Sequence, residues 1–193
     1  MPSGLRQPSP VDHAPMPQPG STTTITTRTR LILLDCFETL VELDAGVYRA
    51  RQGVAAFLAH YRTRQPTPMA VISDAGQSVV EAAIGQAGLL AAFATIYHAG
   101  NASEALPGGR ARKRLDLPLR DFAVHARLAV FIGDSPLDAM AASHHDVPFI
   151  RVPRSEDRDF SFATLIGGPS RYDSAQFSAA FLERNLRDRE RPS

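Results

Sequence analysis

Three polar side chains stand at or just beyond the ends of short apolar runs in this chain of 193 residues. Asp35 and Ser73 each come directly after four apolar residues, and Asp134 follows a third apolar run and a glycine. Apolar runs of this length without a helical period are typical of strands that are buried on both faces of a sheet. Because the carboxyl ends of parallel strands meet in one crevice, we expect Asp35, Ser73 and Asp134 to share a site.

Asp138 and Lys113 complete this set of side chains. Asp138 lies four residues after Asp134, and Lys113 is the only lysine in a chain that otherwise uses arginine. Carboxylates in one pocket repel one another unless a cation neutralises them, and hard oxygen ligands suit Mg²⁺. Such a metal would let a phosphoryl group approach Asp35, which could attack phosphorus as aspartate does in ATPases. Ser73 and Lys113 would then hold the phosphoryl oxygens.

Each of these residues also has a purely structural explanation. Asp35 could cap the turn after its strand, and Ser73 could form a turn of its own. Asp138 could be an acidic residue that the helix dipole favours in the first turn of a helix. Lys113 could be a solvated side chain on a basic surface. The spacing of the residues leaves these alternatives open.

The segments between the apolar runs predict an α/β fold with a doubly wound, Rossmann-like parallel sheet in a single domain. Residues 1–29 are rich in proline, serine and threonine and predict a disordered tail, so that the folded domain spans 30–193. Further along, the sequence predicts helices over 50–64 and 77–94, a short strand over 95–98, a turn-rich loop over 99–111, a helix from Ser135, a strand over 147–152 and a last helix from Asp173.

Composition narrows the classes of partner and compartment. A net charge of +1 gives no reason to expect nucleic acid or a membrane surface as a partner. No segment approaches the roughly 20 apolar residues of a membrane-spanning helix. The single cysteine, Cys36, excludes an internal disulfide and fits a reducing compartment. The sequence therefore predicts a cytoplasmic protein.

Four segments, taken in order, resemble the four motifs of the haloacid dehalogenase superfamily: LILLDCFETLV, AVISDA, Lys113 and VFIGDSPLD. Members of that superfamily are mostly magnesium-dependent phosphohydrolases, so the resemblance implies a phosphorylated small molecule, or an exposed phosphoryl group on a larger substrate, as the partner. It implies Asp35 as the nucleophile and Thr39 as support for the nucleophile's loop. It also implies that Ser73 and Lys113 bind and orient the phosphoryl group.

By the same resemblance, Mg²⁺ is held by Asp35, the main-chain carbonyl of Phe37 and Asp134, with Asp138 coordinating or close behind. Phe37 is itself a departure from the family pattern, because phosphatases of this superfamily carry an aspartate there that protonates the leaving group. A carboxyl acid or base typically contributes about 10²–10⁴-fold in rate, and phenylalanine cannot transfer a proton. Haloacid dehalogenases also have an aromatic residue there, but they lack the metal-binding aspartate that Asp134 supplies.

Three functions follow from this mixed pattern. The first is a Mg²⁺-dependent phosphohydrolase that works through an aspartyl-phosphate on Asp35. The second is a catalytically weak or inactive binding or regulatory protein with the same fold. The third is a dehalogenase-like hydrolase of carbon–halogen bonds. Cys36, Glu38 and Asp74 are the neighbouring groups that could replace the missing acid or base.

The intervals between the motifs are too short to hold a separate cap domain. We therefore expect loops around 43–50 and 99–112 to set specificity. Three arginines in or next to the second loop, Arg110, Arg112 and Arg114, could bind an anionic substrate or form an ordinary solvated surface.

Overall fold

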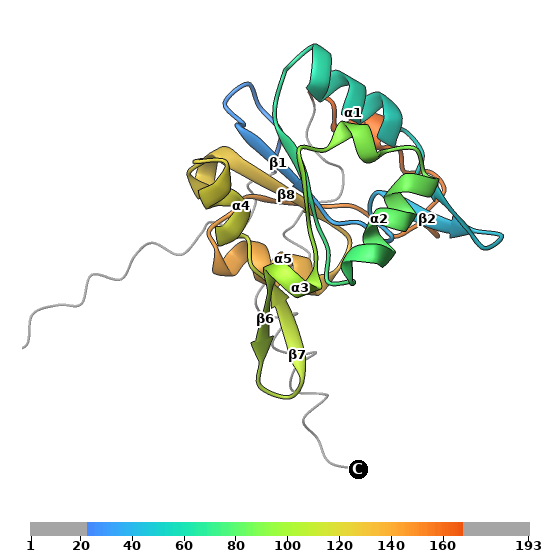
Figure 1. Ribbon diagram of the computed structural model, residues 1–193. Helices are drawn as coiled ribbons and strands as arrows, with labels where there is room; N and C mark the ends of the chain where they lie inside the picture. Colours follow the sequence, from blue (N-terminus) through green and yellow to red (C-terminus); the bar gives the residue numbers. More distant parts are fainter. Residues whose placement is uncertain (1–22, 168–193) are drawn as a thin grey trace, which may run out of the picture.

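The computed structural model of the chain describes residues 23–167 (Figure 1). Its strands are β1 Leu31–Leu34, β2 Val41–Asp44, β3 Val47–Ala50, β4 Met69–Ile72, β5 Thr95–Tyr97, β6 Ser103–Leu106, β7 Arg110–Lys113, β8 Ala129–Gly133 and β9 Phe149–Arg151. Its α-helices are α1 Val54–Thr63, α2 Gln77–Gln86, α3 Ala99–Ala102, α4 Asp116–Asp121 and α5 Pro136–His144. Short 3-10 helices are η1 Leu90–Ala92, η2 Ala126–Leu128 and η3 Phe162–Leu165.

The centre of the molecule is a five-stranded sheet in the order β5-β4-β1-β8-β9. All its strand pairs are parallel, and Leu34 at the end of β1 pairs with Val71 in β4 and with Ile132 in β8. The chain moves outward from β1 through β4 and β5 on one side, and it then places β8 and β9 on the other side. This topology confirms the predicted doubly wound α/β fold. Ligands bind such sheets where the strand order reverses, which here is at the end of β1.

Helices cover both faces of this sheet (Figure 1). Phe57 of α1 and Val80 of α2 pack with Ile32 in one buried cluster. Ala141 of α5 packs with Leu33 in a second cluster on the opposite face. Because alternate residues of β1 enter different clusters, the strand is apolar at every position.

Two short antiparallel hairpins stand where we expected loops. β2 pairs with β3 over the segment around 43–50, and β6 pairs with β7 within 99–112. The β6–β7 hairpin projects from the body of the protein in Figure 1. Gly108 and Gly109 form its turn with φ angles of 80° and 72°, which glycine adopts without strain. The other five strands of residues 23–167 form the central sheet.

The ends of the described region modify two of the sequence expectations. Ile25, in the segment that we assigned to the tail, is 4% exposed and belongs to the core, and the carbonyl of Thr26 accepts a hydrogen bond from Gln65 at 2.7 Å. The helix expected over 77–94 ends at Gln86 and is followed by η1. Residues 1–22 and the last helix predicted from Asp173 lie outside the described residues. No helix within 23–167 combines the length and the apolar character that crossing a membrane requires.

Candidate active site

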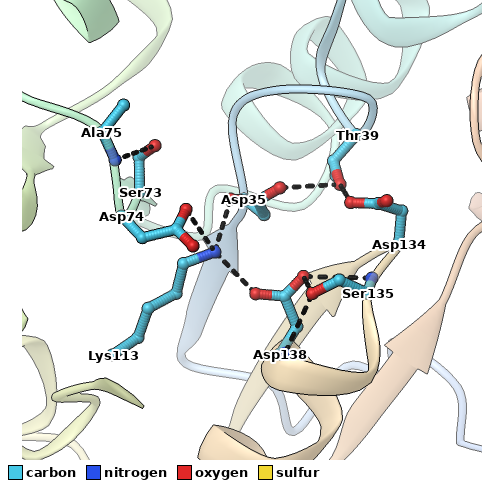
Figure 2. Close-up of polar contacts among 9 residues, drawn as sticks. All are labelled: Asp35, Thr39, Ser73, Asp74, Ala75, Lys113, Asp134, Ser135 and Asp138. Carbon is cyan, nitrogen blue, oxygen red and sulfur yellow. Dashed lines mark hydrogen bonds and ion pairs between the residues drawn. The ribbon is translucent and has the colours of Figure 1, made fainter. Parts of the chain in front are cut away.

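The polar residues singled out in the sequence lie together at the carboxyl ends of the central strands (Figure 2). Six of them are buried: Asp35, Thr39, Ser73, Lys113, Asp134 and Asp138. Burying polar and charged groups costs free energy unless they bond to one another or to a ligand. Their contacts therefore decide what the site can do.

A tight turn after β1 brings Thr39 back to the end of that strand. Leu40 donates a backbone hydrogen bond of 2.8 Å to the carbonyl of Cys36 and closes the turn. The Thr39 hydroxyl then lies 3.1 Å from Oδ2 of Asp35 and 3.1 Å from Oδ1 of Asp134. A hydroxyl carries one proton and can donate it to only one of the two carboxylates. The close approach of the hydroxyl to the other carboxylate is favourable only if that carboxylate carries a proton or if a cation lies beside both carboxylates.

Asp138 is fixed at the start of α5 by a capping box. The Ser135 hydroxyl accepts a hydrogen bond of 3.1 Å from the backbone of Asp138, and Oδ2 of Asp138 accepts from the backbone and hydroxyl of Ser135 at 3.2 and 2.7 Å. A Cβ atom on Gly133 would lie 2.7 Å from the Asp138 carboxyl group, so only glycine fits there. Asp138 lies in the first turn of α5, as the alternative that we considered requires, and it also completes a capping box; its other oxygen faces the site.

Lys113 forms ion pairs with three acidic residues. Its Nζ lies 2.6 Å from Oδ1 of Asp35, 2.6 Å from Oδ1 of Asp138 and 3.7 Å from Oδ1 of Asp74. The Lys113 side chain is 6% exposed, which rules out the alternative of a solvated surface lysine. Lys113 is the last residue of β7, so the projecting hairpin delivers the site's ammonium group.

The charges of the site are unbalanced. Burial raises the pKa of Asp35 to about 8, with Asp138 and Asp134 adding to the rise and Lys113 opposing it. Burial and Asp138 also raise the pKa of Asp134, against the Thr39 hydrogen bond and the charge of Arg154. Burial alone would lower the pKa of Lys113, but Asp35 and Asp138 raise it overall. Lys113 therefore stays charged, but its single positive charge is too little to balance the carboxylates of Asp35, Asp134 and Asp138 if all three are ionised.

The three carboxylates fit a divalent metal ion. One oxygen from each of Asp35, Asp134 and Asp138 lies within 4.8 Å of the others. Carboxylate oxygens suit Mg²⁺, and its two charges would offset the excess that one lysine leaves. Hydrogen bonds already engage both oxygens of Asp35, from Lys113 and Thr39, and both oxygens of Asp138, from Lys113 and Ser135, so a metal held by either residue would share or replace one of these contacts. Coordination by the carbonyl of Phe37 stays a prediction.

Ser73 is held at the end of β4. Its backbone N–H donates a hydrogen bond of 3.0 Å to the carbonyl of Tyr97 in β5, and its hydroxyl accepts one of 3.3 Å from the backbone of Ala75. The turn-forming role that we considered is therefore present. The hydroxyl proton is still available for a phosphoryl oxygen, so the binding role of Ser73 stays a prediction.

The side chain of Phe37 forms an aromatic contact. Its ring packs edge to face on Tyr48 of β3 with 5.4 Å between the ring centroids. The β2–β3 hairpin therefore lies against the position where phosphatases of the superfamily carry an acid. A phenyl ring in this apolar contact cannot donate or accept a proton.

Two of the three possible substitutes for that acid are turned away or inert. Glu38 has a φ of 59°, and its carboxylate accepts hydrogen bonds of 3.1 and 2.5 Å from the backbone and hydroxyl of Ser155. Burial would raise the pKa of Glu38, but the bonds from Ser155 lower it overall. Burial raises the pKa of the Cys36 thiol to about 12. Of the three, only Asp74 turns its carboxylate toward Lys113 (Figure 2).

The arginines that we considered for anion binding have partners of their own. Arg112 pairs with Glu104 at 2.6 Å, and Arg114 pairs with Asp116 at 2.7 Å. The first pair joins the two strands of the β6–β7 hairpin, and the second lies between the end of β7 and the start of α4. A substrate role for Arg110 stays a prediction.

Arg51 and the loop after β9 were missed in the sequence. Arg51 is 4% exposed and donates to the backbone carbonyls of Glu38, Thr39 and Arg154. It thereby ties the turn after β1 to a loop that lies more than a hundred residues later in the chain. No local pattern signals this contact, because an arginine before a helix is usually exposed.

No protein-family model and no curated protein matches the chain. CbbY from Rhodobacter sphaeroides, solved in complex with xylulose 1,5-bisphosphate, is 18% identical, with a TM-score of 0.59 over 75% of this chain and 99% of that chain. A predicted phosphoglycolate phosphatase from Haemophilus somnus 129PT is 14% identical, with a TM-score of 0.57 over 72% of this chain and 97% of that chain. A haloacid dehalogenase superfamily hydrolase of subfamily IA from Geobacter sulfurreducens PCA is 14% identical, with a TM-score of 0.53 over 66% of this chain and 93% of that chain. The chain has the fold of haloacid dehalogenase-like hydrolases.

Proposed function

We propose that this protein is a Mg²⁺-dependent phosphohydrolase that works through an aspartyl-phosphate on Asp35. The observation that carries the proposal is the buried set of Asp35, Asp134 and Asp138, with oxygens within 4.8 Å of one another, around the ammonium of Lys113. The structural likeness to a predicted phosphoglycolate phosphatase and to a protein solved with a sugar bisphosphate supports phosphate esters as the substrate class.

The three carboxylates would hold Mg²⁺, which would neutralise them and screen the charge of the phosphoryl group. One oxygen of Asp35 attacks phosphorus, and the bond to the leaving oxygen breaks with its electron pair on that oxygen. Ser73 and Lys113 donate hydrogen bonds to the phosphoryl oxygens. Water then attacks the phosphorus of the aspartyl-phosphate, which releases inorganic phosphate and restores Asp35.

Phe37 sets the limits of this reaction. Because Phe37 has no proton to give, the leaving oxygen takes its proton from water or from Asp74, the one possible substitute whose carboxylate is turned toward Lys113. We therefore expect aryl esters, whose leaving groups need little protonation, to react faster than alkyl esters. The same residue favours a second candidate function, a phosphate-binding protein that turns over slowly or not at all.

Assays of aryl and alkyl phosphate esters and of 2-haloacids, each with and without Mg²⁺, test the proposal. We expect Mg²⁺-dependent release of phosphate, and mass spectrometry of acid-quenched protein should find Asp35 heavier by one phosphoryl group. Asp35→Asn should abolish both, whereas Asp44→Asn, at an exposed position of β2, should change neither. Halide release from 2-haloacids without Mg²⁺ would point to dehalogenation instead, and binding without turnover would point to the second candidate.

A further inference from the structure

The loop after β9, residues 152–158, is fastened to the segment that follows β1. Its contacts come from three different residues, so the loop is held in one place relative to the end of β1. The contacts are Ser155 to Glu38 at 2.5 and 3.1 Å, Arg51 to the carbonyl of Arg154 at 3.1 Å, and Arg158 to Glu42 at 3.0 and 3.1 Å.

Arg154 extends from this loop toward the acidic residues. Its Nε lies 3.7 Å from Oδ2 of Asp134, which is too long for a hydrogen bond, and its side chain is 59% exposed. Among residues 23–167, no oxygen accepts a hydrogen bond from its guanidinium. A guanidinium has five N–H donors in a rigid fork that matches a carboxylate or a phosphate. Arg154 therefore holds unused donors at the rim of the site.

Other arginines around the site differ in this respect. Arg51 is buried and donates to three backbone carbonyls. Arg112, Arg114 and Arg158 each form a close ion pair with a carboxylate. The backbone of Arg154 is held in place, its side chain lies next to the site, and its guanidinium donates no hydrogen bond to any residue among 23–167.

Arg154 and Lys113 approach different carboxylates. Lys113 contacts Asp35 and Asp138, whereas Arg154 approaches the oxygen of Asp134 that Thr39 does not bind. A phosphoryl group held by Lys113 would leave the fork of Arg154 available for another part of the same substrate.

We propose that Arg154 binds a second anionic group of the substrate, a carboxylate or a second phosphate, a few atoms from the reacting phosphoryl group. The inference rests on the proposed function, because it needs the first phosphoryl group beside Asp35. A second point of attachment would orient the substrate in the site. We therefore expect the protein to prefer phosphate monoesters that carry a second anionic group, a carboxylate or another phosphate.

Calorimetric binding of two phosphonates in Mg²⁺ tests this inference. 3-Phosphonopropionate and propylphosphonate are not hydrolysed, and they differ only in a terminal carboxylate against a methyl group. We expect the wild type to bind 3-phosphonopropionate about tenfold more tightly or better, as a charge-assisted bidentate pair allows. Arg154→Gln should bring the two affinities together, and Arg154→Lys, which keeps the charge without the fork, should lie between. 1,2-Ethanediphosphonate, which carries a phosphonate in place of the carboxylate, shows whether a second phosphate-like group is preferred to a carboxylate.

Arg120→Gln is the matched control, because it removes the same charge from an exposed position on α4 and should keep the preference. Equal binding of the two phosphonates by the wild type would overturn the inference while supporting the proposed function. An equal weakening of both by Arg154→Gln would also overturn it, because Arg154 would then serve only Asp134 or the reacting phosphoryl group. Binding of neither phosphonate would overturn the proposed site and this inference together.

Discussion

The ammonium of Lys113 lies 2.6 Å from the carboxylate of Asp35, with the two side chains only 6% and 7% exposed. Removing both charges from water is costly, and their attraction repays that cost only with good geometry and further hydrogen bonds. Here the same ammonium also serves Asp138, so one positive charge is shared between buried carboxylates. The site should therefore respond strongly to protons and to cations.

The first prediction concerns Mg²⁺ and pH. The pKa of Asp35 is raised in the folded protein from 3.8 to about 8, so the stability that its neutral form contributes is complete below about pH 3.8 and is lost as the pH rises toward 8. Mg²⁺ binds the ionised carboxylate of Asp35 and so offsets this loss of stability. At pH 5 the carboxyl group is protonated, and protons compete with Mg²⁺ for it. We expect Mg²⁺ to raise the melting temperature more at pH 8 than at pH 5 in thermal denaturation.

Asp134→Asn should abolish most of this rise at pH 8, since it removes one of the expected ligands. Asp44→Asn, an exposed aspartate, should leave it unchanged. If the wild type and Asp134→Asn gain equally from Mg²⁺, the metal binds elsewhere.

The second prediction concerns Lys113→Met. Breaking a buried ion pair by removing one partner costs about 3–5 kcal/mol, because an uncompensated charge is left behind. Without Mg²⁺, we expect a loss of this size at pH 8 and a smaller loss at pH 5, where Asp35 takes up a proton. Urea unfolding at both pH values measures the difference. Arg114→Met, at an exposed side chain, should change the free energy of unfolding little at either pH, because exposed ion pairs contribute little to stability. Equal losses at both pH values for Lys113→Met would contradict the charge argument.

The third prediction concerns Gly133→Ala. The new methyl group would lie 2.7 Å from the carboxyl group of Asp138, and that carboxyl is fixed by the capping box and Lys113. Overpacking of this kind typically costs about 1–3 kcal/mol, and we also expect weaker Mg²⁺ binding by calorimetry. Gly76→Ala is the control, because its methyl group would meet nothing within 4 Å. Unchanged stability and metal binding in Gly133→Ala would show that Asp138 moves freely.

The fourth prediction concerns Phe37→Asp. The substitution places a proton donor two residues after Asp35, and we expect turnover of alkyl phosphate esters to rise about tenfold or more. Aryl esters should gain less, because a phenolate leaves with little help. Steady-state rates on matched esters measure this difference.

Phe37→Asn separates proton transfer from packing. It loses the contact with Tyr48 as Phe37→Asp does but carries no acid, so it should show no gain. A folded Phe37→Asp protein that binds Mg²⁺ and is no faster than Phe37→Asn would favour the non-catalytic function.

The sheet and the grouping of polar residues could be predicted because each depends on local sequence. β1, β4 and β8 are buried on both faces and so are apolar at every position. Parallel pairing then brings residues from distant parts of the chain to one edge. The helix start at Ser135 was predicted for the same reason, since the residues that open the helix are adjacent in the sequence.

The remaining features depend on contacts that have no local pattern. The β6–β7 strands are short and polar, so their glycine-rich turn indicated a loop; only the cross-strand pair of Glu104 and Arg112 signals a hairpin in retrospect. Glu38 has a positive φ, and its carboxylate binds Ser155, which lies 117 residues later in the chain. Arg51 and Arg154 meet through the same long-range packing.

The central position of β1 has a consequence for the synthesis of the chain. Among the strands of the central sheet, β1 is synthesised first, yet it pairs with β4 on one side and with β8, nearly a hundred residues later, on the other. Until residues 129–133 have been made, one edge of an entirely apolar strand has no partner from this sheet. Unpaired apolar strand edges are where nascent chains associate with one another, and pairing over long sequence distances is slow. Yield of the folded protein should therefore depend on how well β1 is shielded during translation.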